Sequence, residues 1–224
     1  MSGTPRSAPL PRVEPMGESA VLVTIGEAID PAVGARARAI AAAVAAEPRL
    51  GRAVPAYASV LVPFDPVALS VAEATRIVTD VVVATPAAAA PSGSGRLVEI
   101  AVRYGGEDGP DLDEVAQLNG LRPKDVVEIH AGVEYEAFFL GFAPGFAYLG
   151  PVAASIATPR LDAPRPRVPA GSVAIGGAQT AVYPTETPGG WRLIGRTDAA
   201  LWDVIRDPPA LIRPGDRVRF VPVS

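Results

Sequence analysis

The chain has 224 residues, of which 49% are hydrophobic, and its formal net charge of −4 goes with a pI of about 5.1. The lack of cysteine excludes disulfides, a thiol nucleophile and thiolate metal sites, and one histidine is too few for a metal centre built from several imidazoles. The acidic balance disfavours a general nucleic-acid partner, and no apolar run reaches the roughly 20 residues that a membrane-spanning helix needs.

Residues 1–11 are rich in Pro and Ser and are predicted to form a disordered tail. This stretch lacks the apolar core of a signal peptide, so we expect a cytoplasmic protein. Residues 12–84 follow with alternating and helical apolar patterns. These patterns predict a small α+β domain with elements in the order β-β-α-β-β-α.

Start signals support both helices of this domain. Asp30 is a suitable N-cap, and Pro31 suits the first helical position. The spacing of Ser70 and Glu73 is typical of a capping box at the start of the second helix. Pro48 is expected to end the first helix.

The composition changes at residues 85–95, TPAAAAPSGSG, which predict a linker because Pro, Gly and Ser occur there without a periodic pattern. Residues 96–224 then contain two short helices and many short strands separated by Gly and Pro, which is typical of a mainly-β barrel or sandwich. Asp111 is predicted to cap the first of these helices. Pro123 is predicted to begin the second, which carries His130 in its last turn.

Residues 138–151, FFLGFAPGFAYLGP, hold four of the six Phe residues and no charge. Gly and Pro interrupt the run too often for a helix. Two interpretations stay open. One is a strand leading into a buried turn whose aromatic rings fill a barrel core, and the other is a ligand or partner surface with aromatic walls.

His130 is the only histidine, so any imidazole acid–base step must use it. The structural alternative is a charged ring that complements the helix dipole in the last turn. Arg160, Arg165 and Arg167 lie in a segment stiffened by proline. Arginines on a backbone restricted by proline suit bidentate recognition of a carboxylate or phosphate, but the segment is equally consistent with a solvated loop.

The glycine-rich stretch GSVAIGGAQ at 171–179 lacks the Lys-Ser or Lys-Thr of a P-loop. It therefore indicates either a barrel turn or a backbone nest for an anion. Gln179 is placed where it could hydrogen-bond a polar ligand.

Three stretches carry a family resemblance: GFAPGFAYLG at 141–150, TPR…RVPAGSVAIGGAQT at 158–180 and YPTETPGGWRLIGRT at 183–197. With PAYASVLV at 55–62 and RYGGEDGPDL at 103–112, they resemble the family of the 5-oxoprolinase B subunit. That family also includes the kinase inhibitor KipI and proteins labelled allophanate hydrolase subunit 1. Ala147 stands where the family pattern suggests Pro, and Ala131 where it suggests Ser.

The resemblance implies a small α+β domain followed by a cyclophilin-like β-barrel. It also implies a component of an ATP-dependent 5-oxoprolinase, which acts with a larger C-type subunit and an A-type, lamB/YcsF-like subunit to convert 5-oxoproline to glutamate. ATP is then used at the level of the complex. The alternatives within the family are a KipI-like inhibitor of a histidine kinase and a carboxyltransferase or allophanate hydrolase-type subunit.

His130 and Arg167 are the candidate catalytic residues, and no metal site is expected. The candidate substrate- or partner-binding residues are Phe142, Phe146, Arg160, Gly176, Gly177 and Gln179. Adjacent segments of a small barrel commonly lie side by side. We therefore predict that one concave face is bordered, with His130 nearby, by Phe142, Phe146, Arg160, Arg167 and Gln179.

Overall fold

The structure, a computed structural model, describes residues 11–86 and 95–224, and the chain divides into two compact units, 1–91 and 92–224. Most of the predicted tail, residues 1–10, and most of the predicted linker, residues 87–94, lie outside the described residues. None of the described helices is long and apolar enough to cross a membrane.

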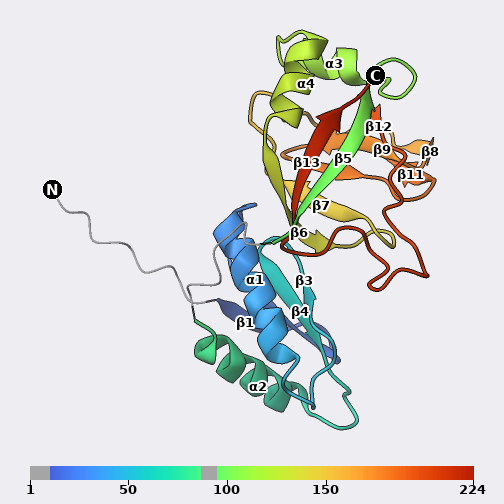
Figure 1. Cartoon of the computed structure of the whole chain (residues 1–224). Helices are drawn as coiled ribbons and strands as arrows, with labels where there is room; N and C mark the ends of the chain where they lie inside the picture. Colours follow the sequence, from blue (N-terminus) through green and yellow to red (C-terminus); the bar gives the residue numbers. More distant parts are fainter. Residues whose placement is uncertain (1–10, 87–94) are drawn as a thin grey trace, which may run out of the picture. The chain divides into compact units, whose positions relative to one another are not determined.

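The N-terminal unit is a four-stranded antiparallel sheet with two helices (Figure 1), in the strand order β1-β2-β4-β3. Its elements follow the predicted sequence: β1 (Arg12–Pro15), β2 (Ala20–Thr24), α1 (Pro31–Val44), β3 (Val54–Pro55), β4 (Ser59–Pro63) and α2 (Val71–Ala84). Alternate residues of the central strands, such as Val21 and Val62, share a core with Ile40 of α1 and Ile77 of α2. Burial of these side chains holds both helices on the sheet.

Both predicted helix starts are confirmed. The Asp30 carboxylate accepts hydrogen bonds from the backbone N–H groups of Ala32 (2.8 Å) and Val33 (3.1 Å). Ser70 and Glu73 form the reciprocal capping box at the start of α2. Helix α1 ends at Val44, its C-cap is Ala45, and Pro48 follows three residues later.

The C-terminal unit is a closed seven-stranded barrel in the order β10-β7-β6-β13-β5-β12-β9, with a separate two-stranded sheet of β11 and β8 (Figure 1). Only the β13–β5 pair within the barrel is parallel among the described strands. The predicted fold class, an α+β unit followed by a mainly-β barrel, is confirmed. The elements are β5 (Leu97–Tyr104), α3 (Leu112–Leu118), α4 (Pro123–Ala131), β6 (Glu134–Leu140), β7 (Ala147–Gly150), β8 (Arg165–Val168), β9 (Ser172–Gly176), β10 (Gln179–Val182), β11 (Thr187–Gly189), β12 (Arg192–Arg196) and β13 (Arg217–Pro222).

One wall of the barrel is buried on both faces. Successive side chains of a strand point to opposite faces. In β9, Val173 and Ile175 belong to the core inside the barrel, whereas Ala174 between them belongs to a second apolar cluster. That cluster lies against the outer face of the wall and gathers Phe146, Val168, Ala174, Ala181, Tyr183, Trp191 and Leu193. It supplies the base of the candidate site.

Three short strands are not apparent from the sequence pattern: β7, β8 and β11 have three or four residues and contain Gly or Pro. The predicted capping role of Asp111 is wrong. Its side chain makes no helix-cap hydrogen bond. Its carboxylate instead accepts from Arg165 (2.6 Å) and from the backbone N–H of Leu193 (2.6 Å), and so ties α3 to β8 and β12.

Candidate functional site

Two consecutive tight turns shape the loop between β6 and β7. The N–H of Ala143 donates to the carbonyl of Gly141 (2.7 Å) around Phe142, which has a φ of 65°. The N–H of Phe146 then donates to the carbonyl of Ala143 (3.0 Å). Within this second turn Pro144 precedes Gly145, whose φ of 84° is the conformation that a type II turn needs at its third residue.

Among the described non-glycine residues, Phe142 alone has a positive φ, and the residue is 60% exposed. A bulky residue in this region costs on the order of 1–3 kcal/mol, and such strain clusters at functional sites. The turn holds the ring edge-on to Phe146, with ring centroids 5.2 Å apart, and to Tyr183 at 6.2 Å. The strained backbone thus presents an aromatic ring to solvent.

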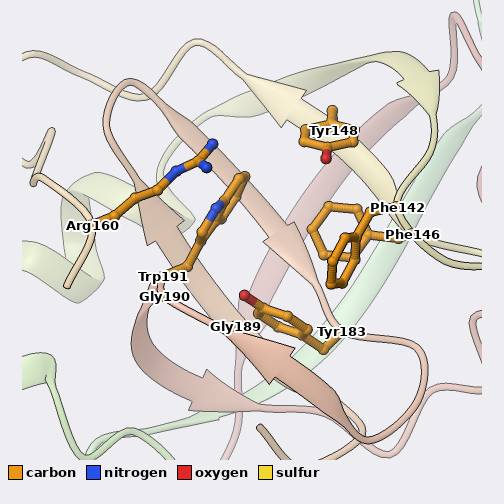
Figure 2. A pocket seen from close by; sticks show the side chains of 8 residues that line it. All are labelled: Phe142, Phe146, Tyr148, Arg160, Tyr183, Gly189, Gly190 and Trp191. Carbon is orange, nitrogen blue, oxygen red and sulfur yellow. The ribbon is translucent and has the colours of Figure 1, made fainter. Parts of the chain in front are cut away.

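Phe142 borders a pocket with a volume of about 110 Å³ beside the outer cluster. Its walls come from four separate segments, and Figure 2 shows two Phe rings on one side facing Trp191 and Arg160 on the other. The lining residues are mostly aromatic: Phe142, Phe146, Tyr148, Arg160, Tyr183, Gly189, Gly190 and Trp191. The ring of Phe146 packs edge-on against its aromatic neighbours at the base.

Arg160 supplies the positive charge of this pocket. Its guanidinium carbon lies 5.3 Å from the centroid of the Trp191 ring, a cation–π arrangement. Among the described residues, no carboxylate forms an ion pair with Arg160. Stacking on the indole orients the guanidinium, while its in-plane N–H groups stay available for an anionic ligand.

The two phenols of the pocket are hydrogen-bond donors at neutral pH. Burial raises the pKa of Tyr148 and of Tyr183, and the charge of Arg160 opposes the shift in both without reversing it. In Figure 2 the phenol oxygen of Tyr148 points toward the space between the rings. A guanidinium and protonated phenols within aromatic walls suit a small ligand that carries a carboxylate or carbonyl oxygen.

The structure brings three of the predicted residues together here, Phe142, Phe146 and Arg160. Arg167 and Gln179, which are predicted to border the same concave face, do not line this pocket. The Arg167 side chain is 80% exposed and lies 3.8 Å from Glu186. The Gln179 Oε1 atom is buried without a hydrogen-bond partner among the described residues.

The two predicted glycines serve the pocket indirectly. A Cβ on Gly176 would lie 2.5 Å from the Trp191 ring, so the bare backbone is what lets the indole reach its position. Gly177 has a φ of 65° and begins the turn into β10, where its N–H donates to the carbonyl of Thr158 (2.8 Å).

His130 lies inside the barrel, with no exposed surface. Thr180 Oγ1 donates its only proton to the carbonyl of Ala174 (3.0 Å), so the 2.9 Å contact to His130 Nε2 requires that Nε2–H donates. Nδ1 is then the acceptor for the hydroxyl of Tyr104 at 2.8 Å. The ring also stacks on Phe220, with centroids 4.6 Å apart.

Burial lowers the pKa of His130 to about 3, so the ring is neutral at pH 7. The helix-dipole role predicted for it needs a charged ring and is therefore wrong. Both ring nitrogens are occupied and the ring does not reach the pocket. These contacts favour a structural role for His130 over the predicted catalytic one.

Sequence reasoning did not select five pocket residues: Tyr148, Tyr183, Gly189, Gly190 and Trp191. All five lie inside the stretches that carry the family resemblance, and Gly189 and Gly190 form the turn before Trp191. A Cβ on Gly189 would lie 2.4 Å from the Tyr183 hydroxyl. The family motif thus indicated the region of the pocket, but the sequence did not show which residues of the motif face one another across it.

Comparison with known proteins places this arrangement in a family. A family model described as carboxyltransferase domain, subdomain C and D, matches residues 11–212. The 5-oxoprolinase B subunit of Bacillus subtilis is 42% identical over 233 aligned positions, which cover 95% of this chain and 93% of that protein. The chain belongs to the 5-oxoprolinase B subunit family.

Solved structures show the same fold within longer chains. TTHA0988 is 40% identical with a TM-score of 0.78, and the match covers 92% of this chain but 40% of that one. The K. lactis urea amidolyase, at 19% identity and a TM-score of 0.81, shares the fold over 99% of this chain and 15% of its own. The fold of this family therefore occurs both as a separate chain and as one part of a larger polypeptide.

Proposed function

We propose that this chain is the B subunit of an ATP-dependent 5-oxoprolinase and contributes a binding pocket to a complex that opens 5-oxoproline to glutamate. The observation that carries the proposal is the 42% identity, over 95% of this chain, to a protein named as the B subunit of 5-oxoprolinase. The word subunit in that name supports a chain that is not active alone. Its partners would be a C-type subunit and an A-type, lamB/YcsF-like subunit.

The chemistry of the pocket agrees with this substrate. Opening the lactam adds water across the amide bond, so the ring carbonyl becomes a carboxylate and the ring nitrogen becomes an amine. Arg160 would bind the carboxylate that 5-oxoproline already carries, and the aromatic walls would cover the ring carbons. A phenol O–H would donate to the lactam carbonyl.

ATP would be bound elsewhere in the complex. The pocket, at about 110 Å³, is smaller than the roughly 300–1,000 Å³ of sites that enclose drug-sized ligands. The glycine-rich stretch at 171–179 also lacks the Lys-Ser or Lys-Thr of a P-loop. These features support assigning the nucleotide to one of the partner proteins.

Reconstitution tests the proposal. The full chain is mixed with C-type and A-type subunits from the same genome, ATP and 5-oxoproline, and glutamate is measured. We expect turnover that needs all three proteins and ATP. Absence of glutamate above the controls, with all three proteins folded, would sink the proposed activity.

Arg160→Gln and Arg167→Gln form a matched pair, since both arginines are exposed and only Arg160 lines the pocket. We expect Arg160→Gln to raise the KM for 5-oxoproline by about tenfold or more, because a charge-assisted hydrogen bond to the substrate is lost. Arg167→Gln should match the unmodified chain. Equal effects of the two variants on KM would contradict the assignment of this pocket as the substrate site. A loss of activity confined to Arg167→Gln would favour the catalytic role predicted for Arg167 from the sequence.

A further inference from the structure

The backbone on both sides of Arg160 is tied to other parts of the barrel unit, although Arg160 itself lies between β7 and β8, outside any strand. Before it, the carbonyl of Pro159 accepts a hydrogen bond from Nε of Arg192 (3.2 Å). After it, the N–H of Leu161 donates to the carbonyl of Gly190 (2.7 Å). Two hydrogen bonds thus fix the backbone from which the guanidinium reaches the indole of the pocket (Figure 2).

Arg192 is placed to hold the carbonyl of Pro159 in one position. Arg192 begins β12, and its side chain is 12% exposed. Its Nη1 atom forms an ion pair with the half-exposed Glu114 of α3, and the two atoms are 2.5 Å apart. Because a guanidinium is planar and carries its donors in a rigid fork, an ion pair at Nη1 fixes the direction in which Nε–H points. Glu114 thus directs Arg192 at the carbonyl that precedes Arg160.

Helix α3 also holds this segment at two other points. Asn119, which follows the helix, donates from Nδ2 to Thr158 Oγ1 (2.9 Å). Asp111, which precedes the helix, accepts from Arg165 (2.6 Å). Thr158 and Arg165 lie on either side of Arg160 in the chain, so polar residues along one helix hold the whole stretch. The ion pair described above is the tie nearest to Arg160.

The Arg192 ion pair has little to add to stability, because a pair with a half-exposed carboxylate contributes little. Arg192 does not line the pocket either. We propose that Arg192, oriented by Glu114, is a positioning residue that keeps the Arg160 guanidinium on the indole, an inference that rests on the proposed function. Without the bond to Pro159, the substrate carboxylate has to order Arg160 as it binds. That cost reduces affinity without changing the chemical step.

NMR spectra of the full chain test the position of Arg160 without any substrate. An aromatic ring shifts the signals of protons above its face upfield, so the Arg160 side-chain protons should resonate upfield of those of a solvated arginine. Their disappearance in Arg160→Gln assigns them. We expect Arg192→Gln to move these signals toward the solvated values. Glu114→Gln, a milder change in a half-exposed side chain, should move them part of the way.

Arg219→Gln is the matched control, because Arg219 also forms ion pairs with two carboxylates of the same unit and does not line the pocket. It should leave the Arg160 signals and the kinetics of the complex unchanged. In the reconstituted complex, Arg192→Gln should raise the KM for 5-oxoproline about three- to tenfold with kcat unchanged. In the Arg160→Gln background the same change should have no further effect, because no guanidinium is left to position.

Thermal unfolding of each variant verifies the fold, and Glu114→Gln decides by the same two measurements if Arg192→Gln does not fold. Unshifted Arg160 signals in the folded variant would overturn the proposal, as would KM increases that multiply in the Arg160→Gln/Arg192→Gln double variant. The NMR comparison does not depend on turnover. Shifted Arg160 signals together with a complex that releases no glutamate would therefore refute the proposed activity alone.

Discussion

Protonation of His130 should govern the loss of stability in mild acid. Its pKa is lowered to about 3 in the fold, against 6.5 for the free side chain. In the unfolded chain the imidazole of His130 therefore binds a proton below pH 6.5, whereas in the folded chain it stays neutral down to about pH 3. Stability is fully present above pH 6.5 and falls as the pH drops.

The size of the effect follows from the linkage relation. Each pH unit below 6.5 costs about 1.4 kcal/mol, so the step from pH 7 to pH 5 costs about 2 kcal/mol in total. That is a large share of the roughly 5–15 kcal/mol by which a domain is stable. His130 is the only histidine, and the lowered carboxyl pKa values, such as those of Glu47 and Asp125 at about 2, act below pH 5. The change in the free energy of unfolding between pH 7 and pH 5 thus reports mainly on His130.

Urea unfolding at half-unit pH steps measures the slope. His130→Gln keeps a donor and an acceptor in the side chain but cannot titrate, so we expect lower stability at pH 7 and no slope between pH 7 and 5. A flat profile for the unmodified chain, or an equal slope in the variant, would refute the reasoning. The NMR signal of the single imidazole provides a second check, because it should not shift between pH 7.5 and 4.5.

Three further changes test the pocket and its supports. Phe142→Gly removes a strained positive φ and should leave the melting temperature unchanged or raised while it weakens 5-oxoproline turnover by the reconstituted complex. Gly176→Ala should destabilise the chain by about 1–3 kcal/mol in urea, because its methyl would overlap an indole ring, whereas Gly26→Ala meets only ordinary contacts. Asp111→Asn should cost about 2–3 kcal/mol by the same measurement, because the carboxylate pairs with a guanidinium and with the backbone.

Local sequence signals were sufficient to predict where the helices of the N-terminal unit begin. Asp30 and the Ser70–Glu73 pair act within four residues of themselves, so the sequence specifies where α1 and α2 begin. The barrel strands are likewise visible as short apolar runs between Gly and Pro. No local pattern shows how these strands pair. The short strands β8 and β11 form because they pair with each other.

The same limit explains which site residues were found. Arg160 and Arg167 each follow a proline, so their local patterns are alike. Arg160 meets Trp191 because the segment before β8 runs beside the turn after β11, where the N–H of Leu161 donates to the carbonyl of Gly190 (2.7 Å). The burial of His130 similarly depends on Thr180 and Phe220, which are distant in sequence. Long-range contacts decide these roles.

Strand alternation separates stability from binding in this barrel. On β10, Thr180 points inward to His130 and Val182 joins the interior core, whereas Ala181 between them joins the outer cluster under the pocket. On β12, Ile194 lies in the interior core and Leu193 in the outer cluster. Because neighbouring residues face opposite sides, the pocket can change its lining without repacking the interior. The inner residues can keep the His130 network intact whatever ligand or partner the outer face meets.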